Sequence, residues 1–175
     1  ADGYGRFLLH DLRRDATGAL KPDFPLNDPR YENAGVLVAR KNFGCGSSRE
    51  AAVYVLVDSG CRCVIAPSFG DIFASNSIKN GLLPAIVSEQ VAEQLLHLPS
   101  VTEGRPLRVD LDAQTITAGN SVFSFSIRAE WKKRLINGWD DVDLTKSYTK
   151  QIEAFVSADA GERPWAVPSV SRQER

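Results

Sequence analysis

The sequence has no methionine, only two histidines and no long apolar run. Its longest unbroken apolar run, Ala51 to Val57, is far shorter than the roughly 20 residues that cross a bilayer. No basic segment followed by an apolar one opens the chain as a secretion signal. These absences predict a protein without a membrane anchor, located in the cytoplasm.

An excess of charge of either sign is also missing. The 175 residues carry 21 Lys and Arg against 22 Asp and Glu, which gives a formal net charge of −1. Nucleic-acid binding needs a clustered basic face that displaces counterions from phosphates, so this balance argues against a nucleic-acid partner. With 43% hydrophobic and 25% charged residues, the composition is that of a globular domain and excludes bulk disorder.

Cysteine is scarce and odd in number. Cys45, Cys61 and Cys63 fit free thiols in a reducing compartment better than a disulfide framework. Cys61 and Cys63, two apart at a strand start, should point to the same face, but an iron–sulfur cluster needs three or four thiolates. We therefore expect buried, inert thiols. His10 and His97 are too few and too scattered for a metal site, so no metal ligand set is expected in this chain.

Apolar runs and helix-compatible segments alternate from residue 35 to residue 98. The expected strands cover 35–39, 62–66 and 82–87, and the expected helices cover 49–59, 70–80 and 89–98. Parallel strands joined by crossover helices are the economical arrangement for such an alternation. Because Pro84 has no N–H to donate, an edge or a terminal position is expected for the third strand.

The second half of the chain changes character. Alternating segments at 107–111, 115–117 and 121–127 predict an antiparallel meander, and 129–137 and 143–156 predict helices separated by Gly138. The fold class is therefore α/β, with a mixed sheet that has a parallel core and an antiparallel meander. We expect one domain over residues 1–157, after a mostly irregular first 34 residues, and an extended or disordered tail over 158–175.

The segment Gly44-Cys45-Gly46-Ser47-Ser48-Arg49-Glu50 places two hydroxyls and a guanidinium between a strand end and a helix start. Glycines let the backbone approach a ligand, the helix N-terminus favours an anion, and a guanidinium can hold a carboxylate by two hydrogen bonds. An equally weighted alternative is a tight turn with Arg49 paired to a surface carboxylate. The spacing is not that of a phosphate loop, a dinucleotide fingerprint or a nucleophile elbow. Asp71, at the next turn, is expected to cap its helix.

Residues 42–50, Asn-Phe-Gly-Cys-Gly-Ser-Ser-Arg-Glu, resemble the signature of the 3-isopropylmalate dehydratase small-subunit family in the aconitase superfamily. Further blocks resemble the same family in the same order along nearly the whole chain. These blocks include 4–5 with 11–13, 22–24 with 26–27, 65–73, 76–77, 80–84, and 137–138 with 143–145.

The resemblance implies a swivelling β/β/α domain that closes over a large subunit carrying a 4Fe–4S cluster. It implies a hydro-lyase, active only with that subunit, which converts 2-isopropylmalate through isopropylmaleate to 3-isopropylmalate in leucine biosynthesis. By the family pattern, Ser47 is the base that takes the C–H proton. Arg49 holds a carboxylate of the small 2-hydroxy diacid substrate, and Ser48 beside them is a substrate-binding hydrogen-bond donor.

Two departures from the family leave alternatives open. Ala51 stands where the family usually has histidine, and the usual N-terminal segment, with an Asp-Thr-Asp type motif and a specificity loop, does not precede Ala1. The chain is thus expected to be trimmed or to be a shortened form. The alternatives are a non-catalytic anion-binding paralogue and the small subunit of a related hydro-lyase of the homoaconitase or citraconate hydratase type. A Cys45 nucleophile is disfavoured because no histidine lies in a partner motif.

Overall fold

The computed structural model describes residues 3–166 of the chain. The chain divides into two compact units, Ala1–Gly138 and Trp139–Arg175. This division comes earlier than the end at residue 157 that the sequence suggests for the domain, and the extent of a swivelling domain stays a prediction.

The first 34 residues form short helical turns rather than long elements. These turns are η1 (Tyr4–Phe7), α1 (His10–Arg13), η2 (Pro25–Asn27) and η3 (Pro29–Tyr31). The segment is anchored at its start, where the Tyr4 N–H donates to Asp58 Oδ2 over 2.7 Å. The expectation of a largely irregular wrap is confirmed.

Three parallel strands form the centre of the first unit. They are β1 (Val36–Val38), β2 (Cys63–Ala66) and β3 (Leu83–Ile86), in the order β1-β2-β3. Val36 is in register with Cys63, and Cys63 with Leu83. Helices α2 (Ala51–Asp58), α3 (Asp71–Lys79) and α4 (Glu89–His97) follow the strands in turn. The predicted alternation is confirmed, with Pro84 in an edge strand.

Three antiparallel strands follow the short helix α5 (Pro99–Thr102). They are β4 (Arg108–Asp110), β5 (Thr115–Ala118) and β6 (Ser121–Ser124). The turn between the last two strands contains Gly119 at φ +60°, as a two-residue hairpin turn requires. Ile86 and Ser126 exchange two backbone hydrogen bonds of 3.1 and 2.7 Å. The parallel core and the meander are therefore two sheets joined by this bridge.

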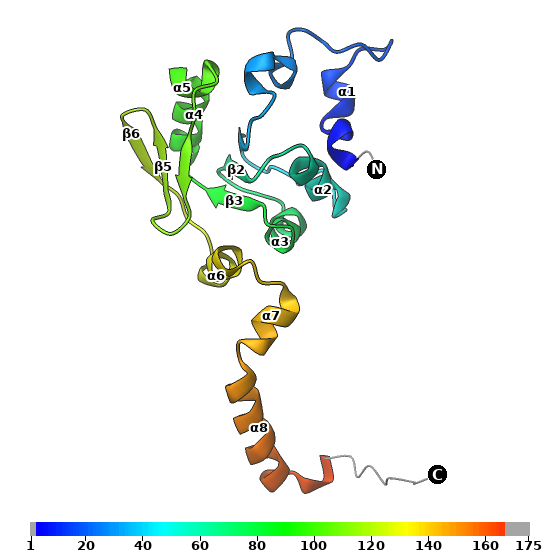
Figure 1. The fold of residues 1–175 in the computed structure, drawn as a ribbon, viewed down its shortest axis with the longest axis vertical. Helices are drawn as coiled ribbons and strands as arrows, with labels where there is room; N and C mark the ends of the chain where they lie inside the picture. The colour runs from blue at the N-terminus through cyan, green and yellow to red at the C-terminus, as the bar shows by residue number, and fades with distance from the viewer. Residues whose placement is uncertain (1–2, 167–175) are drawn as a thin grey trace. The chain divides into compact units, whose positions relative to one another are not determined.

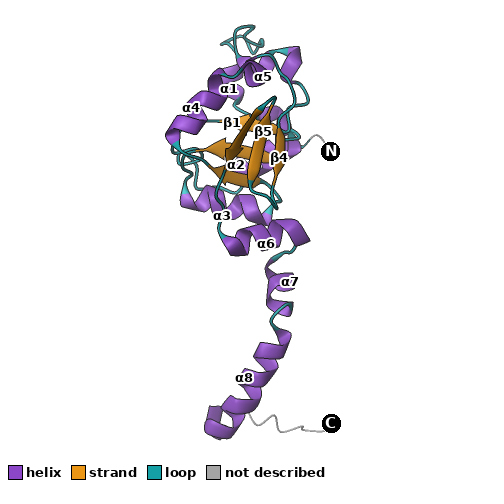
Figure 2. Ribbon diagram, turned by 90° about the vertical axis from the view of Figure 1, so that its left-hand side faces the viewer, coloured by secondary structure: helices purple, strands orange, loops and turns teal. Residues whose placement is uncertain are grey.

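The parallel sheet is covered on both faces (Figures 1 and 2). On one face α2 and α3 contribute Val53, Leu56 and Phe73 to a buried cluster with Val64. The other face packs against α4 and the antiparallel sheet, and its cluster includes Ile65, Leu83, Leu95, Ile116 and Phe125. Full burial of each such aliphatic side chain stabilises by about 1.5–3 kcal/mol, so both faces hold the sheet. Helix α6 (Ala129–Asn137) then ends at Gly138 in the left-handed conformation, as expected.

The prediction that Cys61 and Cys63 share a face is wrong. Cys63 belongs to the cluster of α4 and the antiparallel sheet, whereas Cys61 packs with α2 and α3. The strand begins only at Cys63, so the two-residue alternation does not extend back to Cys61. Both residues are buried and, with exposed Cys45, all three thiols are free, as expected.

The second unit contains α7 (Asp141–Lys146), α8 (Thr149–Glu162) and η4 (Pro164–Ala166). The single helix expected over 143–156 is instead two helices, the first starting from a capping box on Asp140. The expected extended tail is wrong for residues 158–162, where alanines favour helix up to the stop before Pro164. Residues 167–175 lie outside the described part. Among the described residues, no helix is both long and apolar enough to span a membrane.

Candidate active site

Residues 42–50, called the glycine loop below, lie at the carboxyl end of β1, against the loop that follows β2. Asn42 adopts φ +63°, and its N–H donates to Ser68 Oγ over 2.8 Å. The Ser68 hydroxyl donates back to Asn42 Oδ1 over 3.1 Å. Two backbone hydrogen bonds, Phe43 N–H to the Ser68 carbonyl and Gly70 N–H to the Phe43 carbonyl, complete the connection at 3.0 and 2.9 Å. Two strand ends thus fix the position of the loop.

A cluster of three phenylalanine rings packs against this loop. Phe43 packs edge-on against Phe69 and Phe73, with ring centroids 6.3 and 5.3 Å away. Gly44 passes over this cluster at φ +77°, where an added Cβ would collide with Phe73. An added Cβ at Gly46 would meet no neighbouring atom within 4 Å. The sequence assigned both glycines to ligand approach, but the structure shows that Gly44 is required by packing.

Ser47 and Arg49 meet directly before α2. The Arg49 N–H donates to Ser47 Oγ over 3.3 Å, and Ser47 is half-buried while Ser48 and Arg49 are exposed. No carboxylate of the described residues pairs with the Arg49 guanidinium, so the alternative of a surface ion pair is not observed. The residues directly before α2 thus carry a hydroxyl and a guanidinium without a described carboxylate partner next to the positive end of a helix, and these groups are suited to binding an anion.

Glu50, the last residue of the motif, has a structural role that the sequence did not reveal. Its Oε1 accepts a hydrogen bond of 2.9 Å from Asn80 Nδ2 at the end of α3. Loss of hydration, together with the charge of Glu50, raises the pKa of Tyr54. The hydrogen bond from Asn80 to the Glu50 carboxylate connects the start of α2 to the end of α3. Glu50 and Asn80 are 30 residues apart in the sequence, so local sequence patterns could not predict this pair.

The prediction that Asp71 caps its helix is wrong. The N-cap of α3 is Gly70, and no side chain caps this end. A Cβ at Gly70 would lie 3.0 Å from the Cα of Cys45, so close loop packing selects glycine there. Asp71 occupies the first helical position, where its charge complements the helix dipole.

The thiols do not form a site for an iron–sulfur cluster. Burial raises the pKa of both Cys61 and Cys63, which keeps these sulfurs protonated, whereas clusters bind thiolates. No three His, Cys, Asp or Glu residues gather into a metal site anywhere in the described ranges. His97 is an exposed residue in the last turn of α4. The donor set of this chain does not fit a cluster.

Comparisons with known proteins identify the class to which this fold and loop belong. Residues 8–90, which lie within the first unit, match the family model described as the aconitase C-terminal domain. The chain is 46% identical over 167 residues to the 3-isopropylmalate dehydratase small subunit of Rhodospirillum centenum, covering 94% of this chain and 82% of the relative. The small subunit of the same name from Leptospira interrogans is 44% identical, with coverages of 93% and 81%.

The chain belongs to the family of 3-isopropylmalate dehydratase small subunits. A solved structure titled 3-isopropylmalate dehydratase, from Methanocaldococcus jannaschii, is similar with a TM-score of 0.52 and 29% identity. The similarity covers 79% of this chain and 77% of that one. The resemblance on the motifs and the α/β fold class are both confirmed.

Proposed function

We propose that this chain is the small subunit of a hydro-lyase that dehydrates 2-isopropylmalate and rehydrates isopropylmaleate to 3-isopropylmalate, in leucine biosynthesis. Membership of the small-subunit family supports this assignment, and the relatives' name implies a large-subunit partner. The observation that carries it is the juxtaposition of Ser47 Oγ and Arg49 in front of α2, with a guanidinium that no described carboxylate occupies.

Ser47 is proposed as the base. In the dehydration, its oxygen, as the alkoxide, takes the proton from the C–H carbon, the C–H electrons form the double bond, and the C–O bond on the adjacent carbon breaks with its electron pair on the departing hydroxide. Release of the proton from Ser47 then regenerates the alkoxide, so that this proton and the hydroxide together make up the water that is lost. A serine hydroxyl is too weakly acidic to do this unaided. The alkoxide therefore requires backbone donors and positive charge, and the Arg49 N–H at 3.3 Å, the Arg49 guanidinium and the N-terminus of α2 can supply both.

Arg49 is proposed to hold a substrate carboxylate, and Ser48 to donate a hydrogen bond beside it. A guanidinium matches a carboxylate by two parallel hydrogen bonds, which fixes the orientation of a small diacid as well as its position. Both side chains are exposed, so a substrate can reach them from the solvent.

The 4Fe–4S cluster belongs, in this proposal, to the large subunit. Bound there, it supplies Lewis acidity at the departing hydroxyl, which the donor set of this chain cannot provide. The complex is proposed to work in the cytoplasm, consistent with three free cysteines, and to need neither nucleic acid nor membrane.

The test is dehydration of 2-isopropylmalate by the full chain assembled with its cluster-loaded large subunit, followed by the ultraviolet absorbance of isopropylmaleate. Homocitrate-type hydroxy triacids and citramalate-type hydroxy diacids are assayed in parallel. Turnover of 2-isopropylmalate at the highest kcat/KM supports the proposal. A preference for another hydroxy acid assigns the chain to a related hydro-lyase, and a silent, cluster-replete complex identifies a non-catalytic anion-binding paralogue.

A further inference from the structure

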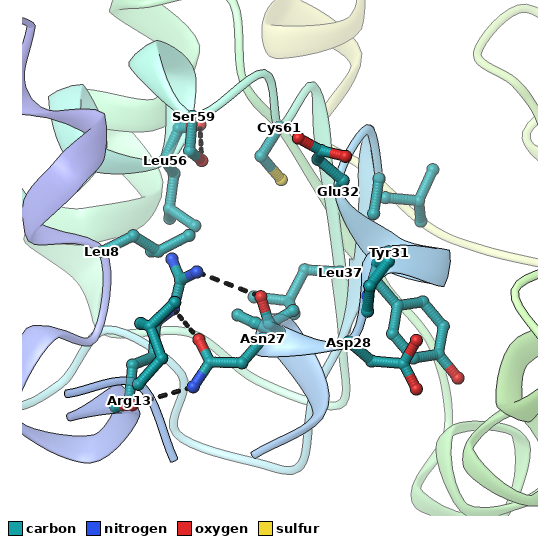
Figure 3. A pocket seen from close by; sticks show the side chains of 15 residues that line it. Leu8, Arg13, Asn27, Asp28, Tyr31, Glu32, Leu37, Leu56, Ser59 and Cys61 are labelled. Carbon is teal, nitrogen blue, oxygen red and sulfur yellow. Dashed lines mark hydrogen bonds between the residues drawn. The ribbon is translucent and has the colours of Figure 1, made fainter. Parts of the chain in front are cut away.

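A cavity lies at the amino end of β1, whereas the glycine loop follows the carboxyl end of the same strand. It has a volume of about 340 Å³ and opens between the N-terminal segment and the start of β1, where α2 ends (Figure 3). None of its lining residues comes from the glycine loop. Its volume is near the lower end of the roughly 300–1,000 Å³ typical of small-molecule sites, which restricts an occupant to a small metabolite.

One side of the cavity is aliphatic. Leu8 from the N-terminal segment, Leu37 from β1 and Leu56 from α2 all line it. Leu56 is 3% exposed and belongs to the core of the unit, so this wall is preformed. Such a surface accommodates a compact branched hydrocarbon group.

A positioned cation lies at the cavity. The half-buried Arg13 donates from Nε to Asn27 Oδ1 over 2.8 Å and from Nη2 to the Leu26 carbonyl over 3.1 Å. Its Nη1 has no partner among residues 3–166, and no described carboxylate neutralises the charge. A guanidinium held by neutral acceptors in this way is ready to bind a carboxylate.

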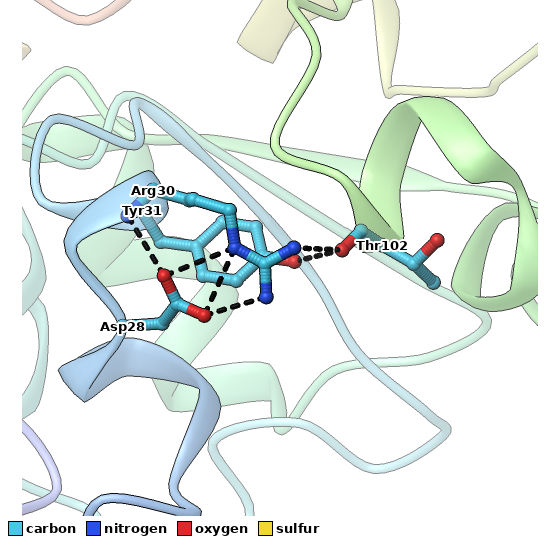
Figure 4. Close-up of polar contacts among 4 residues, drawn as sticks. All are labelled: Asp28, Arg30, Tyr31 and Thr102. Atoms are coloured by element: carbon cyan, nitrogen blue, oxygen red, sulfur yellow. Dashed lines mark hydrogen bonds and ion pairs between the residues drawn. The ribbon is translucent and has the colours of Figure 1, made fainter.

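Two carboxylates, those of Asp28 and Glu32, also line the cavity, and only Asp28 pairs with a cation in the described part of the chain. Arg30 binds Asp28 from Nε and Nη2 over 3.0 and 2.5 Å, and these bonds lower the pKa of Asp28 (Figure 4). Arg30 Nη1 and the Tyr31 hydroxyl also donate to the Thr102 carbonyl, which anchors the pair to the end of α5. Asp28 is therefore already neutralised.

Glu32 is the carboxylate that remains. It lines the cavity on the side away from Arg13 in the view of Figure 3, and no cation in the described part of the chain pairs with it. The neighbouring Cys61 thiol stays protonated because burial raises its pKa, and the Ser59 hydroxyl donates to the Leu56 carbonyl. The cavity thus offers one available cation, one available anion and an aliphatic wall.

We propose that this cavity binds a free α-amino acid with a branched aliphatic side chain. Its carboxylate pairs with Arg13, its ammonium group pairs with Glu32, and its side chain packs against Leu8, Leu37 and Leu56. A ligand with only one of the two charges leaves a cavity charge without a partner. The free amino acid is therefore favoured over a simple fatty acid or amine.

The test is titration of the full chain with L-leucine by calorimetry and by amide chemical-shift changes. We expect saturable 1:1 binding, with shifts at residues 8, 13, 32 and 56. The probes 4-methylpentanoate and 3-methylbutylamine, which lack the ammonium group and the carboxylate respectively, should bind at least about tenfold more weakly. Equal affinity of either probe, or no saturable binding of leucine, would overturn the proposal.

Variants locate the site. Glu32 is exposed in the turn that ends η3, and Glu32→Gln should weaken leucine binding by about tenfold, whereas the exposed control Glu130→Gln should leave it unchanged. Arg49→Lys should also leave it unchanged, because Arg49 follows the carboxyl end of β1 and does not line the cavity. Loss of binding in Arg49→Lys would place leucine in the glycine loop and contradict the second site, independently of whether the dehydratase proposal holds.

Discussion

Gly44 passes so close to Phe73 that a Cβ at position 44 would lie 2.2 Å from the Cγ of the ring. Phe73 is 3% exposed and packed edge-on against Phe43, so the ring has no space into which to move. The backbone at Gly44 also has φ +77°, which disfavours any residue with a Cβ. This contact couples the conformation of the glycine loop to the core beneath it.

Gly44→Ala is therefore expected to destabilise the chain by about 2–4 kcal/mol, through overpacking and a left-handed backbone. Gly46→Ala is the matched control, because a Cβ there meets no atom within 4 Å. It should change the free energy of unfolding by less than about 0.5 kcal/mol. Urea denaturation compares the two variants, and equal stabilities would show that the contact with Phe73 does not constrain the loop.

Arg49→Lys should reduce kcat/KM of the assembled complex by about 10- to 100-fold, because lysine cannot make the paired hydrogen bonds to a carboxylate. Stability should not change, since no described carboxylate depends on Arg49. Arg40→Lys is the control. Arg40 is exposed just before the glycine loop but pairs with Glu93, and its replacement should leave kcat/KM unchanged. Similar losses in both variants would contradict a specific role for Arg49.

Asn80→Asp should destabilise the fold at pH 7 by about 1–3 kcal/mol, because it sets a carboxylate against Glu50 where an amide now donates over 2.9 Å. The loss should shrink near pH 4, where carboxyl groups take up protons. In the double variant with Glu50→Gln, most of the stability should return. Additive effects in this cycle would show that the two side chains do not interact.

The thiols should react in two classes. Exposed Cys45 is expected to react with a disulfide reagent within minutes, whereas buried Cys61 and Cys63 react only on unfolding. Burial raises the pKa of both buried thiols in the folded chain, so unfolded protein loses these protons first as pH rises past about 8.5. The free energy of unfolding should therefore fall above that pH, and less so in Cys61→Ala/Cys63→Ala. Three equally fast thiols would contradict this packing.

The alternation of apolar runs predicted the architecture because period and turn chemistry are local properties. The helix over 89–98 and the helix stop at Gly138 were both predicted from neighbouring residues, and both occur, the first with Ser88 as its N-cap. Contacts between distant segments were not readable. The bridge between Ile86 and Ser126, which joins the two sheets, depends on how the meander packs after it has formed.

The residues of the candidate site could be named from the sequence, whereas the contacts that hold their loop in place could not. Ser47, Ser48 and Arg49 stand out because a hydroxyl pair and a cation follow glycines before a helix. What holds them could not be inferred: the hydrogen bonds between Asn42 and Ser68 span 26 residues, and the helix cap falls on Gly70 rather than Asp71. Local sequence indicates which side chains could bind a ligand or catalyse a reaction. Tertiary packing decides which residues of the motif support the fold and which remain accessible to a ligand.

Ser47→Ala in the assembled, cluster-loaded complex tests the central claim most directly. The hydroxyl accepts one long hydrogen bond, so complex assembly and thermal stability should match wild type. The rate of isopropylmaleate formation from 2-isopropylmalate should fall by about 10²–10⁴-fold in kcat, with little change in KM. A Ser47→Ala complex that turns over at the wild-type rate would contradict the proposal that this serine is the base.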